Sequence, residues 1–408
     1  MTAGVLCTGT ELTRGEVVNT NASWLSDRAT QAGMEVTEIV CVDDDQQRII
    51  QALCRMSALH EVVLCTGGLG PTSDDFTSTC AAMAAGVPLV RDAASVDAIR
   101  DRFRRLGRVM VPSNVKQADI PSGATVMTNA MGTAPGFWMH IGRAAVFFFP
   151  GVPQEMFRMW EEHAEPVVRS LAKVPTAQVR FQTFGDGESM IASRLSDIEQ
   201  KFAGITVGYR AAFPTVEVKL LARGTDAHAL VDSAAACVRK RLGSLVFAEG
   251  QKTLSCVVAD AIRARGYRLA LAESCTGGLI ARLLTREPAS DYFVAGVVVY
   301  ANEAKTEILG ISKAMIETHG AVSEAVAKAM AEGVACKMGV ELGVGVTGIA
   351  GPTGGTFDKP VGLVHFAVAY PGGVQARSQV FSGDRERVQK HAAVATLNLL
   401  RSCLSESG

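Results

Sequence analysis

The sequence lacks the features of an exported, membrane-spanning or zinc-binding protein. Its ten cysteines are scattered, none forms a C-x-x-C pair, and no Cys/His cluster has the spacing of a zinc site. The N-terminus has no signal-peptide pattern, and apolar runs such as Gly296–Ala301 are far shorter than the ~20 residues that span a bilayer. Free thiols suit a reducing compartment, so we predict a cytoplasmic protein without a membrane span.

Charge of either sign is not in excess. The chain has 40 basic and 41 acidic residues among 408, which gives no general attraction to nucleic acid or to a membrane surface. Several arginines crowd the segment 100–108, where the sequence is compatible with a solvated helix face or with an anion site. With 48% hydrophobic residues, the chain can form two or three domains, each with its own core.

The order of apolar segments divides the chain into three predicted domains. Over residues 1–170, strands such as 62–65 alternate with helices such as 46–59, which is typical of a parallel sheet covered by helices. Residues 171–247 have the β-α-β-β-α order of a small α+β module, with its first helix over 188–202. The alternation resumes over residues 248–408. We therefore expect an α/β protein with a small α+β domain in its middle.

Ser274 is the strongest candidate for a reactive side chain. It lies between a predicted strand and a predicted helix and is followed by Thr276–Gly278. Glycines allow a tight turn, and N–H groups at a helix start stabilise an anion or a developing oxyanion. A serine hydroxyl also needs a base. Lys305 is the candidate, in the first turn of a helix that we expect Asn302 to cap, because burial lowers the pKa of a lysine.

A glycine-rich loop over 347–355 follows another predicted strand and completes the set. Taken singly, Ser274 also suits a helix cap, Lys305 a surface position and the loop an ordinary turn. Loops at the carboxyl ends of neighbouring parallel strands meet in one crevice, however. Together the three segments therefore predict an active site.

These segments, in this order, resemble the motifs of the CinA family, and the resemblance covers essentially the whole chain. It implies a nicotinamide mononucleotide deamidase that forms nicotinate mononucleotide and ammonia and needs no cofactor at this site. The C-terminal motifs are Glu273-Ser274-Cys275-Thr276-Gly277-Gly278, Tyr300-Ala301-Asn302-Glu303-Ala304-Lys305, His319-Gly320-Ala321-Val322-Ser323, Gly348-Ile349-Ala350-Gly351-Pro352 and Ser382-Gly383-Asp384-Arg385.

By this resemblance Ser274 is the nucleophile and Lys305 the general base. Tyr300 is an orienting or proton-relaying hydroxyl, and Thr347 positions the substrate or the nucleophile. The segment 286–292 is slightly shorter than in the family, so an altered loop must deliver Lys305 to Ser274. Arg385 is either a phosphate partner or an ordinary first-turn helix residue. The residues expected to hold the nucleotide are Cys275, Thr276, Gly277, Gly278, Asn302, Gly348, Gly351 and Arg385.

A second candidate site surrounds Thr66–Thr77 in the N-terminal region. Its glycines after a predicted strand suit a phosphate, and its adjacent aspartates suit a divalent cation or, alternatively, a helix cap. The segments 8–11 and 43–45 follow two further strands. This set resembles the molybdopterin-binding domain family, and the CinA form of that domain continues through 129–137 and 150–156.

The CinA form implies a metal-dependent ADP-ribose pyrophosphatase. A divalent cation (Mg²⁺, Mn²⁺ or Co²⁺, with K⁺ as a further candidate) would bridge the diphosphate and activate water. The resemblance makes Asp44 and Asp75 metal-binding or catalytic residues, with Asp74 as a further metal ligand. The remaining residues expected to contact this substrate are Thr10, Glu11, Gly67, Gly68, Gly70 and Thr77.

Three hypotheses follow for the whole chain. The first is a bifunctional, homodimeric hydrolase of nicotinamide mononucleotide and ADP-ribose that binds neither membrane nor nucleic acid. The middle module resembles a KH-type domain but has no Gly-x-x-Gly clamp for RNA. The second is a deamidase whose N-terminal domain binds a nucleotide or a pterin without turnover. The third is a non-enzymatic competence adaptor, for which the sequence offers no basic stripe or disordered tail.

Overall fold

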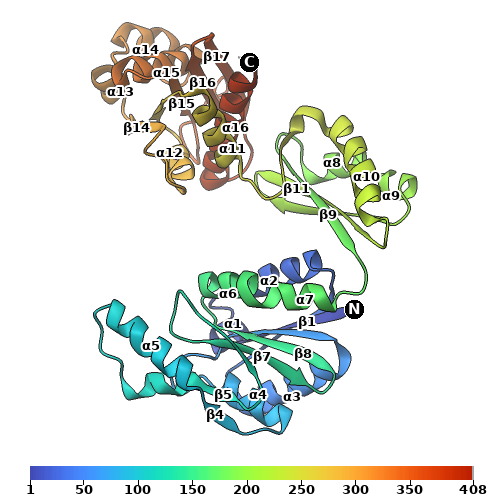
Figure 1. Cartoon of the computed structure of the whole chain (residues 1–408). Helices are drawn as coiled ribbons and strands as arrows, with labels where there is room; N and C mark the ends of the chain where they lie inside the picture. The colour runs from blue at the N-terminus through green and yellow to red at the C-terminus, as the bar shows by residue number, and fades with distance from the viewer. Residues whose placement is uncertain (407–408) are drawn as a thin grey trace. The chain divides into compact units, whose positions relative to one another are not determined.

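The computed structural model describes residues 1–406 and has the α/β architecture expected from the sequence (Figure 1). The chain divides into two compact units, one formed by Met1–Ala177 with Ala222–His228 and the other by the remaining residues. Within residues 1–406, no helix has the combined length and apolarity needed to cross a membrane.

The N-terminal domain contains a six-stranded mixed sheet. Its elements are β1 (Thr2–Thr8), α1 (Thr10–Thr13), α2 (Thr20–Gln31), β2 (Glu35–Val42), α3 (Gln46–Leu59), β3 (Val62–Thr66), α4 (Thr77–Ala85), β4 (Leu89–Arg91), α5 (Ala93–Arg105), η1 (Pro112–Ala118), β5 (Asp119–Pro121), β6 (Thr125–Met127), β7 (Gly136–Ile141), β8 (Ala144–Phe149), α6 (Pro153–Met159), η2 (Trp160–Ala164) and α7 (Glu165–Leu171). The sheet order is β2-β1-β3-β8-β7-β6, with the first four strands parallel and β7 and β6 antiparallel.

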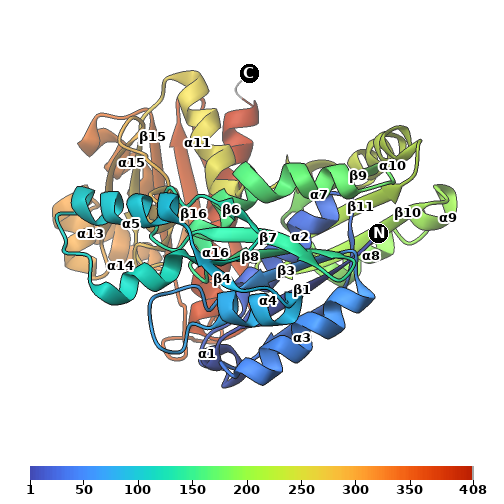
Figure 2. The same ribbon diagram turned by 60° about the horizontal axis from the view of Figure 1, so that its bottom comes forward.

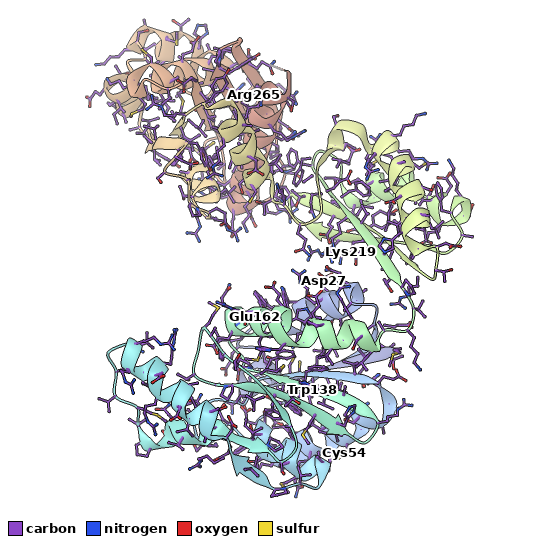
Figure 3. All side chains as sticks on the ribbon, in the orientation of Figure 1. Asp27, Cys54, Trp138, Glu162, Lys219 and Arg265 are labelled. Atoms are coloured by element: carbon purple, nitrogen blue, oxygen red, sulfur yellow. The ribbon has the colours of Figure 1, made fainter. Side chains whose placement is uncertain are left out.

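Helices cover both faces of this sheet, α2, α6 and α7 on one side and α3 and α4 on the other (Figure 1). Val5 and Cys7 of β1 belong to the first core, and Leu6 between them belongs to the second. This alternation follows from the two-residue period of a strand. Trp138 of β7, labelled in Figure 3, stacks on Phe147 of β8 with ring centroids 5.5 Å apart. Because the first four strands of the sheet are parallel, their carboxyl ends lie together at one edge.

The arginine-rich segment lies on α5. Arg100 pairs with Asp97 at 2.6 Å and Arg104 with Asp101 at 3.0 Å, one helical turn apart. All four side chains are exposed. These contacts favour the solvated helix face over an anion site.

The middle module has a four-stranded sheet in the order β10-β11-β9-β12. Its elements are β9 (Thr176–Thr183), α8 (Glu188–Arg194), α9 (Ile198–Lys201), β10 (Ile205–Ala212), β11 (Thr215–Arg223), α10 (Ala227–Leu242), η3 (Gly243–Leu245) and β12 (Val246–Glu249). The single helix predicted over 188–202 is wrong, because the chain turns between α8 and α9. Leu195 and Ile198, on either side of this turn, are both buried.

The C-terminal domain contains a five-stranded sheet in the order β14-β13-β15-β16-β17. Its elements are α11 (Leu254–Arg265), β13 (Leu269–Glu273), α12 (Leu279–Leu284), β14 (Phe293–Val298), α13 (Asn302–Leu309), α14 (Lys313–His319), α15 (Glu324–Met338), β15 (Leu342–Gly348), β16 (Leu363–Tyr370), β17 (Gly373–Val380) and α16 (Arg385–Glu406). β14, β13 and β15 are parallel, and β16 and β17 add an antiparallel hairpin.

This sheet is also covered on both faces, with α11 and α16 on one side and α15 on the other (Figure 2). Leu271 of β13 packs in the first core, and Ala270 and Ala272 pack in the second. The parallel order brings the carboxyl ends of β14, β13 and β15 side by side. The three segments of the predicted C-terminal site follow these strand ends.

Candidate active sites

Ser274 and Lys305 meet at the carboxyl end of the C-terminal sheet. Ser274 follows β13 directly, and its N–H donates to the Val346 carbonyl of β15 at 3.0 Å. Lys305 lies in the first turn of α13, with its Nζ 3.3 Å from the Ser274 Oγ. Both side chains are buried. The segment between β13 and α13 therefore brings the amine to the hydroxyl.

Burial weakens the preference of Lys305 for its charged form. The residue is 2% exposed, and burial lowers its pKa from the usual 10.5. Its Nζ also donates to the backbone carbonyls of Val299 at 2.9 Å and Tyr300 at 3.0 Å. A neutral amine has two N–H groups, which the two carbonyls accept, and one lone pair, which is then left for the Ser274 proton. The geometry suits a general base.

The carboxylate of Glu273, rather than Ser274, caps the helix α12. It accepts hydrogen bonds from the N–H groups of Gly278 at 3.1 Å, Ile280 at 3.2 Å and Ala281 at 2.9 Å. The expected anion site at this helix start is therefore wrong, because these donors already have a buried acceptor. Sequence reasoning missed the role of Glu273 because it lies five residues ahead of the cap position, and only the tight Gly277–Gly278 turn hints at the contact.

The turn after Ser274 still offers polar groups to a substrate. Among the described residues, no acceptor is assigned to the N–H of Cys275 or of Thr276. The Thr276 hydroxyl is buried and is likewise unpartnered within residues 1–406. Such donors beside a nucleophile suit an oxyanion. Cys275 itself is a poor nucleophile, because burial raises the pKa of its thiol to about 12.

Arg385 joins two loops of the site. Its Nη2 donates to the Tyr300 hydroxyl at 2.6 Å, and its Nη1 donates to the Gly351 carbonyl at 2.8 Å. Arg385 is thus a first-turn residue of α16 that also lies at the site. The Tyr300 ring is 57% exposed, and Lys305 contacts the backbone carbonyl of Tyr300 rather than its hydroxyl.

Two buried or half-buried side chains hold the loop His319–Ser323. Thr347, at the end of β15, donates its hydroxyl to the Ala321 carbonyl at 2.8 Å. Lys359 donates its Nζ to the carbonyls of His319 at 3.0 Å and Val322 at 2.7 Å. Thr347 therefore stabilises the loop in this structure. Lys359 stabilises the same loop, a role that sequence reasoning missed. Its place in a Lys-Pro-Val-Gly run was the only available signal.

Three further residues of the predicted nucleotide site have different local roles. Asn302 is an exposed residue inside α13, and the predicted cap is wrong because the helix begins earlier, with Ala301 at the cap position and no side-chain cap bond. A side chain at Gly348 would come within 2.7 Å of the Leu363 carbonyl. Gly351 has a φ of +84°, which favours glycine. The two glycines thus shape the loop after β15.

Most predicted residues of the N-terminal site line one cleft with a volume of about 520 Å³. Thr10 and Thr77 are outside this lining, but each forms a hydrogen bond to a residue that belongs to it. The Thr10 N–H donates to the Asp44 Oδ2 at 2.8 Å, and the Thr77 N–H donates to the Gly68 carbonyl at 3.0 Å. A side chain at Gly68 would collide with the Thr77 hydroxyl. The predicted residues in the lining are Glu11, Asp44, Gly67, Gly68, Gly70, Asp74 and Asp75.

The adjacent aspartates Asp74 and Asp75 converge on Thr72. The Thr72 hydroxyl lies within hydrogen-bonding distance of both carboxylates, and its N–H donates to the Asp75 Oδ2 at 2.8 Å. The hydrogen bond from Thr72, together with the nearby Lys116 ammonium, lowers the pKa of Asp74. Neither carboxylate caps α4, whose cap position is Phe76. The helix-cap alternative is therefore wrong for both.

The carboxylates fit a metal site that a substrate completes. Within the described part of the chain, no three His, Cys, Asp or Glu side chains gather closely enough to hold a metal ion. Asp74 and Asp75 therefore form a pair, without Asp44 as a third ligand. Mg²⁺ is often held by one or two carboxylates together with substrate phosphates. The acidic residues in the cleft lining are Glu11, Asp44, Asp74, Asp75 and Glu155, and the lining contains no Lys, Arg or His.

Comparisons with known proteins cover all three domains. Residues 251–404 match the family model of the CinA C-terminal domain, residues 4–170 a probable molybdopterin binding domain, and residues 179–248 the damage-inducible protein CinA KH domain. A CinA-like protein of Anaeromyxobacter dehalogenans (strain 2CP-C) is 44% identical over 411 residues, 99% of this chain and 100% of the relative. The chain belongs to the CinA family. A second CinA-like protein, from Geobacter sulfurreducens, is 43% identical over 407 residues, 98% of both chains.

A crystal structure of a CinA superfamily protein from Klebsiella pneumoniae is 35% identical and covers 38% of this chain and 96% of that chain, with a TM-score of 0.37. The family matches and the element order confirm the predicted family and the three-module α/β architecture.

Proposed function

We propose that the C-terminal domain hydrolyses the carboxamide of nicotinamide mononucleotide to nicotinate mononucleotide and ammonia. The main support is the buried Lys305 amine, whose hydrogens have two carbonyl acceptors and whose Nζ lies 3.3 Å from the Ser274 Oγ. A serine hydroxyl attacks an amide only when a base takes its proton. The identity of the substrate is inferred from the resemblance of the motifs to those of the CinA family.

In the proposed reaction, the Ser274 Oγ attacks the carboxamide carbon while Lys305 takes the hydroxyl proton. The N–H groups of Cys275 and Thr276 stabilise the oxyanion that forms. Lys305 returns the proton to the amide nitrogen, the C–N bond breaks, and ammonia leaves an ester on Ser274. Lys305 then takes a proton from water as the water attacks the ester. Lys305 returns this proton to the Ser274 Oγ as the ester C–O bond breaks, which releases nicotinate mononucleotide and restores both the serine and the neutral amine.

Ammonia release from nicotinamide mononucleotide tests this proposal. Replacing Ser274 with Ala removes the attacking oxygen and should lower kcat/KM by at least about 1,000-fold, as for other covalent nucleophiles. The matched control is Ser378→Ala, at an exposed position of β17, which should keep the wild-type rate. An unchanged rate in Ser274→Ala would contradict the assignment of the nucleophile.

For the N-terminal domain we propose hydrolysis of the diphosphate of ADP-ribose. The support is a cleft with five acidic residues and no basic side chain, because such a cleft repels a diphosphate unless a bound cation offsets the charge. When bound, a divalent cation would polarise a phosphate and lower the pKa of water. Asp74 and Asp75 would hold this cation with the phosphate oxygens. The glycine turn after β3 would lie against the phosphates.

A second candidate function is nucleotide binding without turnover, which the lack of a three-ligand metal cluster in residues 1–406 favours. Product formation from ADP-ribose, measured with Mn²⁺ and again with a chelator, separates the two. Conversion to AMP and ribose 5-phosphate that the chelator abolishes, and that Asp75→Asn lowers, supports the hydrolase. Tight nucleotide binding without product in either condition supports the binding module.

A further inference from the structure

One wall of the N-terminal cleft has no role in the proposed hydrolysis. It is formed by the loop 129–134, which the side chain of Asn129 holds in place. The Asn129 Oδ1 accepts two N–H groups of the loop, at 3.0 and 2.7 Å, and its Nδ2 donates to the Ala134 carbonyl at 2.8 Å and to Glu155 at 2.7 Å. Thr133 and Ala134 of this loop line the cleft. Hydrogen bonds of one side chain therefore hold this wall in a defined conformation.

Gln117, at the end of η1, contacts this wall and also lines the cleft. Its Nε2 donates to the Thr133 Oγ1 at 3.2 Å. The residue is only 6% exposed, yet its Oε1 is buried and has no hydrogen-bond partner among the residues that the structure describes. A buried polar atom without a partner costs free energy. Because Gln117 lines the cleft, a ligand in the cleft can supply the missing donor.

The free positions on Gln117 form a definite pattern. One Nε2 hydrogen goes to Thr133, so one N–H and the Oε1 of the same amide are left for a ligand. A side-chain amide that offers an acceptor and a donor side by side pairs bidentately with adenine, whose amino group donates and whose neighbouring ring nitrogen accepts. Hypoxanthine carries an oxygen in place of the amino group, and this oxygen would face the Oε1.

Asn21 provides a contrast within the same cleft. Its Oδ1 is also buried and unpartnered in the described chain, but its Nδ2 already donates to the Thr66 hydroxyl at 3.3 Å and to the Gly151 carbonyl at 2.8 Å. Asn21 therefore has only an acceptor to offer, which suits a hydroxyl. Of these two residues, only Gln117 offers both an acceptor and a donor to a purine base.

We propose that Gln117 recognises the base of the nucleotide bound in the N-terminal cleft and selects adenine over hypoxanthine. This assignment rests on the proposed nucleotide function of the cleft. In this proposal the loop 129–134 has a role in base recognition. The loop holds Thr133, and Thr133 orients the Gln117 amide.

Calorimetric binding of AMP and IMP in the presence of Mg²⁺ tests the proposal, because the two nucleotides differ only at one edge of the purine: IMP has an oxygen in place of the amino group and a hydrogen on the neighbouring N1. The full-length wild type should bind AMP roughly 5- to 100-fold more tightly than IMP, the discrimination expected of one bidentate amide pair. In Gln117→Leu the affinity for AMP should fall to that for IMP. Gln47→Leu, at an exposed position of α3, is the matched control and should keep the preference.

Equal binding of AMP and IMP by the wild type would overturn the proposal, and so would a preserved preference in a folded Gln117→Leu variant. Either result leaves the proposed hydrolysis standing if ADP-ribose is still converted. A wild type that binds neither AMP nor ADP-ribose, and forms no product, would overturn both proposals. Equal binding of AMP and IMP by the wild type overturns the proposal even if Gln117→Leu fails to fold.

Discussion

Burial of a single amine determines the chemistry of the C-terminal site. All three partners of the Lys305 Nζ are neutral oxygen atoms, from Val299, Tyr300 and Ser274. A buried ammonium is poorly solvated, and for Lys305 this effect outweighs the opposing charges of Cys275 and Glu303, so its pKa falls. The result is a buried amine next to a hydroxyl, the arrangement on which the proposed amidase reaction depends.

The pH dependence of the amidase reaction follows from this burial. Lys305 is active when neutral, so kcat/KM should rise as the pH increases through a pKa that lies below the usual 10.5. Lys305→Arg keeps the positive charge and should lower kcat/KM by about 100- to 10,000-fold, the contribution of a general base. Initial rates of ammonia release across pH measure both effects. An activity that decreases with rising pH while the protein stays folded would contradict the role of Lys305.

Sequence reasoning indicated that Ser274 and Lys305 lie together, as they do in the structure, but it missed the residues that support them. Ser274 and Lys305 belong to motifs whose composition indicates a nucleophile and a base. The roles of Glu273 and Lys359 depend on which backbone groups the fold brings to them, such as the carbonyls of His319 and Val322. Residue type and spacing contain little of that information.

Among the secondary-structure elements, α12 has an unusual start. Its first N–H groups are bound by Glu273, a residue of the preceding strand, across the turn that carries Ser274. The turn is therefore fixed at both ends. The Ser274 N–H binds the sheet at one end, and the Glu273 carboxylate binds the start of the helix at the other. One side chain thus links the stability of the helix to the position of the nucleophile.

Glu273→Gln should destabilise the C-terminal domain. The amide keeps one acceptor oxygen but loses the negative charge and the second acceptor that the three N–H groups share. We expect a loss of about 1–3 kcal/mol in the free energy of unfolding, the usual cost of a buried polar group left without its partner. Urea unfolding measures it, with Glu287→Gln, an exposed residue, as the control. Equal unfolding midpoints for the two variants would show that Glu273 is not the cap.

Element boundaries were harder to predict than the elements themselves. The apolar periodicity correctly indicated the alternation of strands and helices in both large domains. The break between α8 and α9 was missed, because Leu195 and Ile198 have the spacing of one continuous helix face. Burial of both side chains across a turn is a tertiary effect.

The whole molecule separates its two candidate sites. The residues of the N-terminal cleft belong to one compact unit, and Ser274 and Lys305 belong to the other. The order of the three modules was readable from the sequence. The metal geometry was not, because whether Asp44, Asp74 and Asp75 converge depends on side-chain positions.

Each reaction should therefore survive loss of the other site. Ser274→Ala should keep the wild-type conversion of ADP-ribose, and Asp75→Asn should keep the wild-type release of ammonia from nicotinamide mononucleotide. Both assays on both variants measure this independence. A single substitution that abolishes both activities in a folded protein would show that the units do not act separately.

The crystal structure of Ser274→Ala with nicotinamide mononucleotide bound is the most direct test of the central claim. The carboxamide carbon should lie over residue 274, roughly 3–3.5 Å from the position of the missing oxygen. The carboxamide oxygen should face the N–H groups of Cys275 and Thr276, with the Lys305 Nζ beside it. A nucleotide bound with its phosphate in this turn and its carboxamide directed away from Lys305 would contradict the account.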